Sequence, residues 1–134
     1  MALELSNISE LLELAKSGDR RSLSRLLSEL AQSDKTTVPR PDSIWTLGVT
    51  GPPGSGKSTL IGRLAKHWVE RGESVAILAL DPTSPISGGS FLADRIRMEG
   101  SDLGERVFVR SIASGNNPGG ISPQIWPMCY SLAL

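Results

Sequence analysis

An eight-residue stretch, GPPGSGKS at residues 51–58, constrains this chain more than any other feature. It holds a glycine, a second glycine five positions later, and then lysine and serine. Glycines let the backbone curl so that successive N–H groups face an anion, and a helix that starts there adds its dipole. The lysine can reach the β- and γ-phosphates of a nucleotide, and the following hydroxyl can ligate Mg²⁺. We therefore expect a phosphate-binding P-loop, in which a nucleoside triphosphate is held by Gly51, Pro52, Pro53, Gly54, Ser55, Gly56, Lys57, Ser58 and Thr59.

The segments around this loop have the pattern of an α/β fold. Short apolar runs bounded by turn residues indicate buried parallel strands, and apolar residues at helical spacing indicate a covering helix. A strand, the loop, a helix and a second strand would form one right-handed βαβ unit. The expected strands are 44–49, 75–80 and 107–112, and the expected helices are 57–71, ended by Gly72, and 91–98. The sequence thus predicts a P-loop NTPase with a mainly parallel sheet flanked by helices.

The first thirty residues predict two short helices that precede this fold. Their apolar residues recur at i, i+3, i+4 and i+7, first from Ile8 and then from Leu23. Gly18 is suited to end the first helix, and Asp19 to cap the second. Residues 32–42 contain two prolines and no apolar period, which is typical of a linker. We therefore expect an N-terminal helical extension at 1–42 and a nucleotide-binding domain at 43–134.

Composition excludes several classes of partner. Fourteen basic and fourteen acidic residues give a net charge of zero, so no basic excess favours nucleic acid or an anionic membrane. No apolar run approaches the ~20 residues that span a bilayer. A single cysteine, Cys129, cannot form an internal disulfide, and the acidic N-terminus lacks the basic start of a signal peptide. These features predict a soluble cytoplasmic protein.

Two aspartates are candidates for the chemistry next to the phosphates. Asp81 follows the second predicted strand, at the sheet edge where open α/β folds bind ligands. It can hold Mg²⁺ or orient a water, although an Asp-Pro pair is also a common start of a turn. Asp94 lies on the predicted helix 91–98, and by residue chemistry alone it is more typical of a solvated helix face.

The segment DPTSPISGGSFLADRIRM at 81–98 resembles the switch I region of the MeaB/ArgK group of P-loop GTPases. The early GDRRSLSRLLSEL at 18–30 is similar to the helical region of the same family. The resemblance implies a GTPase that loads and protects a cobalamin-dependent acyl-CoA mutase and uses GTP and Mg²⁺. It also implies that a homodimer is one possible state of the full-length protein. It implies catalytic roles for Lys57, Asp81 and Asp94, and metal ligation by Ser58, Asp81 and Asp94.

The chain departs from this family in its second half. After Gly120 there is no candidate for the Walker B acid or for the aspartate that reads the guanine base. We therefore expect an N-terminal fragment, incomplete at the C-terminal side of the fold, with slow hydrolysis and with ATP still open as the nucleotide. Two other functions are considered: a small-molecule kinase, and a non-catalytic remnant that contacts a partner through its leucine-striped helices.

Other residues have the pattern of structural ones. His67 is expected to be a partly buried helix residue, because a lone histidine makes no metal site. Cys129 has no basic neighbour that would activate its thiol. Trp45, Trp68 and Trp126 are expected to be packing residues.

Overall fold

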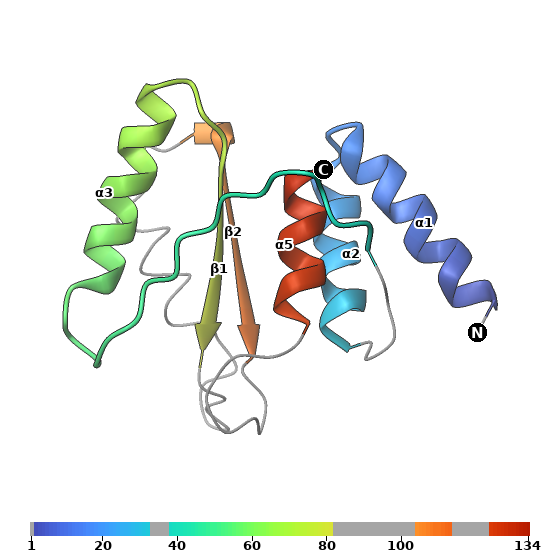
Figure 1. Ribbon diagram of the computed structural model, residues 1–134, viewed down its shortest axis with the longest axis horizontal. Coiled ribbons are helices and arrows are strands. Elements are labelled where there is room, and N and C mark those ends of the chain that lie inside the picture. Colours follow the sequence, from blue (N-terminus) through green and yellow to red (C-terminus); the bar gives the residue numbers. More distant parts are fainter. Residues whose placement is uncertain (1, 33–37, 82–103, 114–123) are drawn as a thin grey trace. The chain divides into compact units, whose positions relative to one another are not determined.

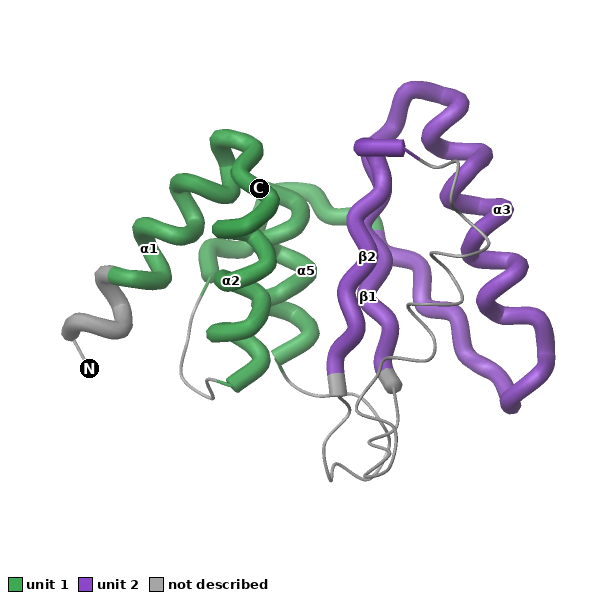
Figure 2. The backbone as a smooth tube through the Cα atoms, turned by 180° about the vertical axis from the view of Figure 1, so that it is seen from behind, with its two compact units in different colours: residues 1–45, 122–134 green, residues 46–121 purple. Residues whose placement is uncertain are grey.

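A computed structural model describes residues 2–32, 38–81, 104–113 and 124–134. Two compact units make up the chain (Figure 2): Met1–Trp45 together with Ser122–Leu134, and Thr46–Ile121. We refer to them as the helical unit and the α/β unit. The predicted helix at 91–98 lies outside the described residues.

The helical unit contains α1 (Ala2–Lys16), α2 (Arg20–Gln32) and α5 (Ile125–Ala133), drawn in blue, cyan and red in Figure 1. Gly18, with φ of 95°, ends α1, and its N–H donates to the carbonyl of Ala15 at 3.0 Å. The N–H of Asp19 donates to the carbonyl of Leu14 at 3.2 Å, which completes a Schellman motif. Both predicted helices and the glycine stop are therefore confirmed.

Asp19 caps α2 as its sequence position predicts. Its carboxylate accepts the backbone N–H of Arg21 at 3.1 Å and that of Ser22 at 3.3 Å, and it also accepts the Ser22 hydroxyl. The Ser22 hydroxyl, followed by the Arg21 N–H, lowers the pKa of Asp19 below its usual value. Because these donors stabilise the ionised form, the cap is strongest when Asp19 is charged.

The third helix of this unit, α5, is not among the helices that the sequence predicts. Pro127 is the reason that the segment does not look helical, but it lies in the first turn of α5, where its missing N–H costs nothing. The helix packs against α2 and contributes Met128 to a buried set. The buried apolar side chains of the helical unit are Leu11, Leu12, Leu26, Leu27, Leu30, Val38 and Met128.

The α/β unit contains α3 (Lys57–Glu70), β1 (Val75–Asp81), the short 3-10 turn η1 (Gly104–Arg106) and β2 (Val107–Ala113). The two strands are parallel, with Val75 opposite Val107 and Asp81 opposite Ala113. Alternate residues of both strands turn toward α3, and a small core forms around Ala65 and Ile77. The prediction of these two strands is confirmed.

Helix α3 ends as the sequence predicts. The Gly72 N–H donates to the carbonyl of Val69 at 2.9 Å, and the Glu73 N–H to that of Trp68 at 3.0 Å. Arg106 from η1 donates to the carbonyl of Gly72 at 2.8 Å. The turn that leads into β1 is therefore stabilised both by its own backbone hydrogen bonds and by a side chain from η1.

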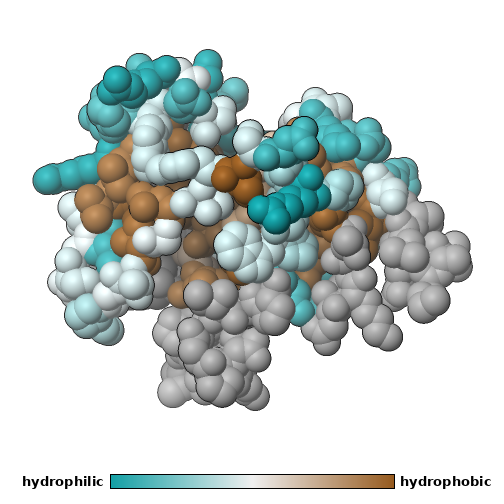
Figure 3. All heavy atoms as spheres, viewed as in Figure 1, coloured by the Kyte–Doolittle hydropathy of each residue, from teal (hydrophilic) through white to brown (hydrophobic). Residues whose placement is uncertain are grey.

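The strand expected at 44–49 does not form, and that prediction is wrong. The segment has no regular secondary structure, Trp45 is 72% exposed and Leu47 is 52% exposed. An apolar segment makes a strand only where a neighbouring strand supplies backbone hydrogen bonds, and within the described residues the segment 44–49 pairs with neither β1 nor β2. Figure 3 shows hydrophobic surface, in brown, next to hydrophilic surface on both units.

The observed fold is α/β with a small two-stranded parallel sheet, a partial P-loop NTPase fold.

Within the described residues, no helix has the length and apolarity that crossing a membrane requires.

Candidate functional site

The glycine-rich loop curls ahead of α3 with alternating signs of φ. Gly54 has φ of 76° and Gly56 has φ of 85°, whereas no described non-glycine residue has a positive φ, so Ser55 between them is negative. A residue pair of opposite handedness turns successive N–H groups toward one point and forms an anion-binding nest. The Ser55 N–H donates to the carbonyl of Pro52 at 3.3 Å and closes the turn. This curl is what the phosphate-binding prediction requires.

Gly56 is the N-cap of α3 and leaves the helix start open to a ligand. Its φ and ψ are 85° and 14°, and no side chain caps the helix by a hydrogen bond. The first intrahelical bond runs from Leu60 N–H to the carbonyl of Gly56 at 2.9 Å. Backbone N–H groups of a first helical turn have no partner within the helix, and the dipole makes that end attract anions.

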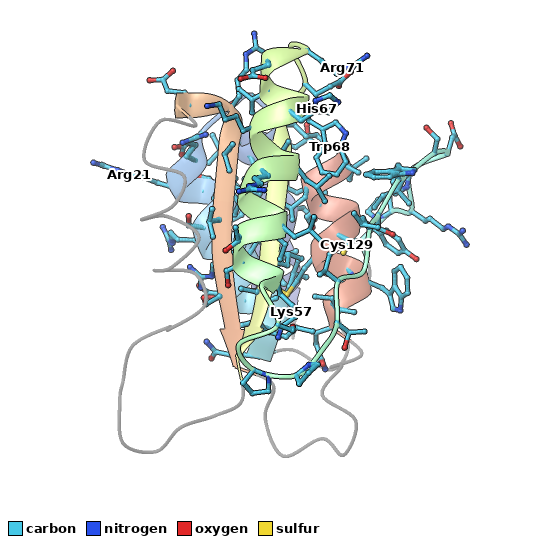
Figure 4. All side chains as sticks on the ribbon, turned by 90° about the vertical axis from the view of Figure 1, so that its left-hand side faces the viewer. Arg21, Lys57, His67, Trp68, Arg71 and Cys129 are labelled. Atoms are coloured by element: carbon cyan, nitrogen blue, oxygen red, sulfur yellow. The ribbon has the colours of Figure 1, made fainter. Side chains whose placement is uncertain are left out.

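Lys57 is the first residue of α3, and its side chain folds back over the loop. The ammonium Nζ donates to the carbonyl of Gly51 at 2.8 Å and to that of Pro52 at 2.7 Å. Figure 4 shows Lys57 at the end of α3 that the loop enters, with His67 and Arg71 near the opposite end. An ammonium carries three protons, so these two bonds leave one for a further acceptor such as a phosphate oxygen.

The structure describes the side chains of some of the remaining predicted site residues but not those of others. Ser58 is half-buried in the first turn of α3, and Thr59 after it is exposed. Asp81 is the last residue of β1, and Figure 1 shows that this end of β1 and the loop end of α3 lie on the same side of the α/β unit. The side chain of Asp81 and all of Asp94 lie outside the described residues.

Of the three side chains expected to bind Mg²⁺, the structure describes that of Ser58. A magnesium ion in a nucleotide site is held by one or two protein oxygens together with phosphate oxygens and water. The Ser58 hydroxyl, one residue after Lys57, is an oxygen donor of this type. No group of three or more acids, cysteines and histidines gathers among the described side chains, and a nucleotide-bound magnesium needs none because the phosphates supply ligands.

Three other predictions concern residues away from the loop. His67 is exposed, not partly buried, and its Nε2 lies 3.0 Å from Nη1 of Arg71 one turn along α3. Trp45 at 72% and Trp126 at 53% exposure are also not packed in a core. Burial raises the pKa of the Cys129 thiol, which agrees with the expectation of an unreactive cysteine.

The Pro52 carbonyl is a site feature that the sequence prediction did not single out. It accepts both the Ser55 N–H and the Lys57 ammonium, and so joins the turn to the charged side chain. The sequence signal for it was present in the Pro52-Pro53 pair, which removes two N–H groups from the front of the loop.

A left-handed glycine pair, an uncapped helix start and a lysine folded over the loop together define the P-loop class of nucleotide-binding α/β proteins. The model of the family described as methylmalonyl Co-A mutase-associated GTPase MeaB matches residues 10–132. The chain belongs to this family.

Known relatives agree with this assignment. The chain is 41% identical over 123 residues to a putative GTPase of Pyrococcus abyssi, a match that covers 86% of this chain and 38% of the relative. It is 43% identical over 76 residues to the GTPase ArgK of Escherichia coli, covering 57% of this chain and 23% of ArgK. A mitochondrial methylmalonic aciduria type A homolog of Caenorhabditis briggsae is 38% identical over 84 residues, covering 62% of this chain and 20% of the homolog. No solved structure matches the chain.

The chain therefore spans less than half of the length of these relatives.

Proposed function

We propose that this chain binds GTP with Mg²⁺ through the loop at 51–59, as the nucleotide-binding part of a GTPase that serves a cobalamin-dependent acyl-CoA mutase. The observation that carries the proposal is the Lys57 ammonium, held 2.8 and 2.7 Å from two carbonyls of its own loop at an uncapped helix start. A cation held at a helix N-terminus that no side chain caps is suited to a polyphosphate.

Each residue has a distinct role in this proposal. The N–H groups of Gly54, Gly56, Lys57 and Ser58 donate to phosphate oxygens, and the Lys57 ammonium neutralises charge on the β- and γ-phosphates. The Ser58 hydroxyl, Asp81 and Asp94 hold Mg²⁺ directly or through water, and the ion would neutralise charge that develops on the transferred phosphoryl group. The position of Asp81 at the carboxyl end of β1, on the loop side of the unit, supports its part in this set.

The partner and the preference for guanine rest on the family. The matched family is named for association with methylmalonyl-CoA mutase, and the Escherichia coli relative is named a GTPase. A switch that reports the nucleotide state to a mutase, with a homodimer in the full-length protein, is the role that this membership supports.

The test is a titration of the purified chain with fluorescent GTP and ATP analogues in Mg²⁺. Wild type should bind, and Lys57→Ala should bind about 10- to 150-fold more weakly, because a charge-assisted hydrogen bond is worth about 1.5–3 kcal/mol. Lys66→Ala is the matched control, since Lys66 lies exposed on the same helix and removal of its charge should leave the affinity near wild type. Equal affinities for wild type and Lys57→Ala would refute the proposed site.

The same samples test nucleotide choice and turnover. Tighter binding of GTP than of ATP would support the family role, whereas a preference for ATP would favour the kinase alternative. We expect these 134 residues to hydrolyse GTP more slowly than ~1 per second, a rate typical of competent phosphoryl transfer, because they contain no candidate for the Walker B acid.

A further inference from the structure

Both carbonyls that hold Lys57 belong to peptide bonds that precede a proline. The Gly51 carbonyl is in the Gly51–Pro52 peptide, and the Pro52 carbonyl is in the Pro52–Pro53 peptide. Neither peptide unit carries an N–H group, so this part of the loop presents acceptors alone. The loop is thus divided into a front half that can bind a cation and a back half, from Gly54 onward, that can donate to an anion.

The prolines also limit where these carbonyls point. A proline ring fixes its own φ near −65° and restricts ψ of the residue before it to extended values. The direction of the Pro52 carbonyl depends on φ of Pro52 and on ψ of Pro52, and the second of these is restricted by the ring of Pro53. Two consecutive rings therefore orient the carbonyl that lies 2.7 Å from Nζ of Lys57.

We infer that Pro52 and Pro53 are positioning residues that hold the Lys57 ammonium in place before the nucleotide arrives. Acceptor oxygens alone would repel a phosphate, and the ammonium between them and the anion reverses that effect. With alanine at either position, the loop would gain an N–H group and additional backbone conformations, and the carbonyls would spend less time directed at Nζ. This inference rests on the proposed function, because it concerns the affinity of the same loop for nucleotide.

The test is a double-mutant cycle, with Mg²⁺ and fluorescent GTP titrated to millimolar concentration. Pro52→Ala and Pro53→Ala should each weaken binding about two- to fivefold, the factor expected for the backbone freedom that one proline removes. In a Lys57→Met background the same proline substitutions should have no effect, since there is no ammonium left to position. Pro39→Ala, at an exposed proline outside the loop, serves as the matched control and should bind as wild type does.

The outcomes separate the two proposals. If Lys57→Met weakens binding while both proline variants bind as wild type does, the positioning role is wrong and the nucleotide site stands. Equal losses from proline substitution with and without Lys57 would also overturn the role, because the prolines would then act on the loop in general. If wild type binds no nucleotide, the proposed function fails, and the positioning role fails with it.

Discussion

The substitution Gly56→Ala isolates the conformational requirement of the loop. Gly56 has φ of 85° and ψ of 14°, and a Cβ atom built on it would meet no heavy atom within 4 Å. The added methyl group therefore has space, and its cost comes from the left-handed backbone alone. That cost is about 1–2 kcal/mol for a residue with a side chain.

This strain must appear in the nucleotide-bound protein. If the variant keeps the native loop, the free energy of unfolding falls by about 1–2 kcal/mol; if the free loop relaxes, nucleotide affinity falls about 5- to 30-fold instead. In either case the unfolding free energy of the nucleotide-saturated protein falls by the same amount. Chemical denaturation with saturating Mg²⁺ and GTP measures the total loss of unfolding free energy, and denaturation without them measures the loss in the free protein. A nucleotide titration measures the loss of binding free energy.

Two other glycines provide controls. A Cβ on Gly48 also has open space, and its φ is not positive, so Gly48→Ala should change neither quantity. Gly72 has φ of 86° at the other end of α3, and Gly72→Ala should lower stability by a similar amount while the folded protein keeps its affinity. If Gly56→Ala matched wild type in both stability and affinity, the reasoning from the left-handed loop would be refuted.

Two further predictions concern the helical unit. The pKa of Asp19 is lowered by its bonds to Ser22 and Arg21, so its stabilising contribution is present above the unfolded value of about 3.9 and is lost as the pH falls through the folded pKa. Asp19→Asn keeps the cap without the titration. Thermal melts of the two proteins should differ at neutral pH and converge as the pH falls through the folded pKa of Asp19; a constant difference would contradict the assigned cause. Leu26→Ala should cost about 2–5 kcal/mol because that side chain is fully buried, whereas Leu14→Ala, at a leucine that is 43% exposed, should stay within about 0.5 kcal/mol in urea denaturation. Equal effects of the two substitutions would show that the helices do not pack as described.

The features predicted correctly from sequence depend on a few neighbouring residues. Glycine at 18 and at 72 stops a helix because the left-handed turn is inexpensive only for that residue, and Asp19 caps the next helix through donors two and three positions away. The loop at 51–58 also depends on neighbouring residues alone, since its glycines, its lysine and the helix start lie within one short segment. Strand β1 was recognisable as an uninterrupted apolar run, and β2 as a short run of mostly apolar residues that include two valines and an isoleucine.

The features that sequence analysis did not find depend on distant parts of the chain. The run at 44–49 is mostly apolar, but it lacks a pairing partner among the described residues, and its tryptophan is exposed. Helix α5 has a proline and no clear period, yet it forms because Met128 can be buried in a unit with α2, nearly one hundred positions earlier.

By itself the sequence determined the local geometry of this protein: which residues form the curled loop, which lysine folds over it, and where the helices next to the loop begin and end. These outcomes follow from φ preferences and hydrogen bonds between residues a few positions apart. Only the tertiary structure decided which apolar segments are buried, where the tail forms a helix, and which two carbonyls hold Lys57. Burial and acceptor geometry depend on what else lies nearby in space, and a pattern along the chain does not contain that information.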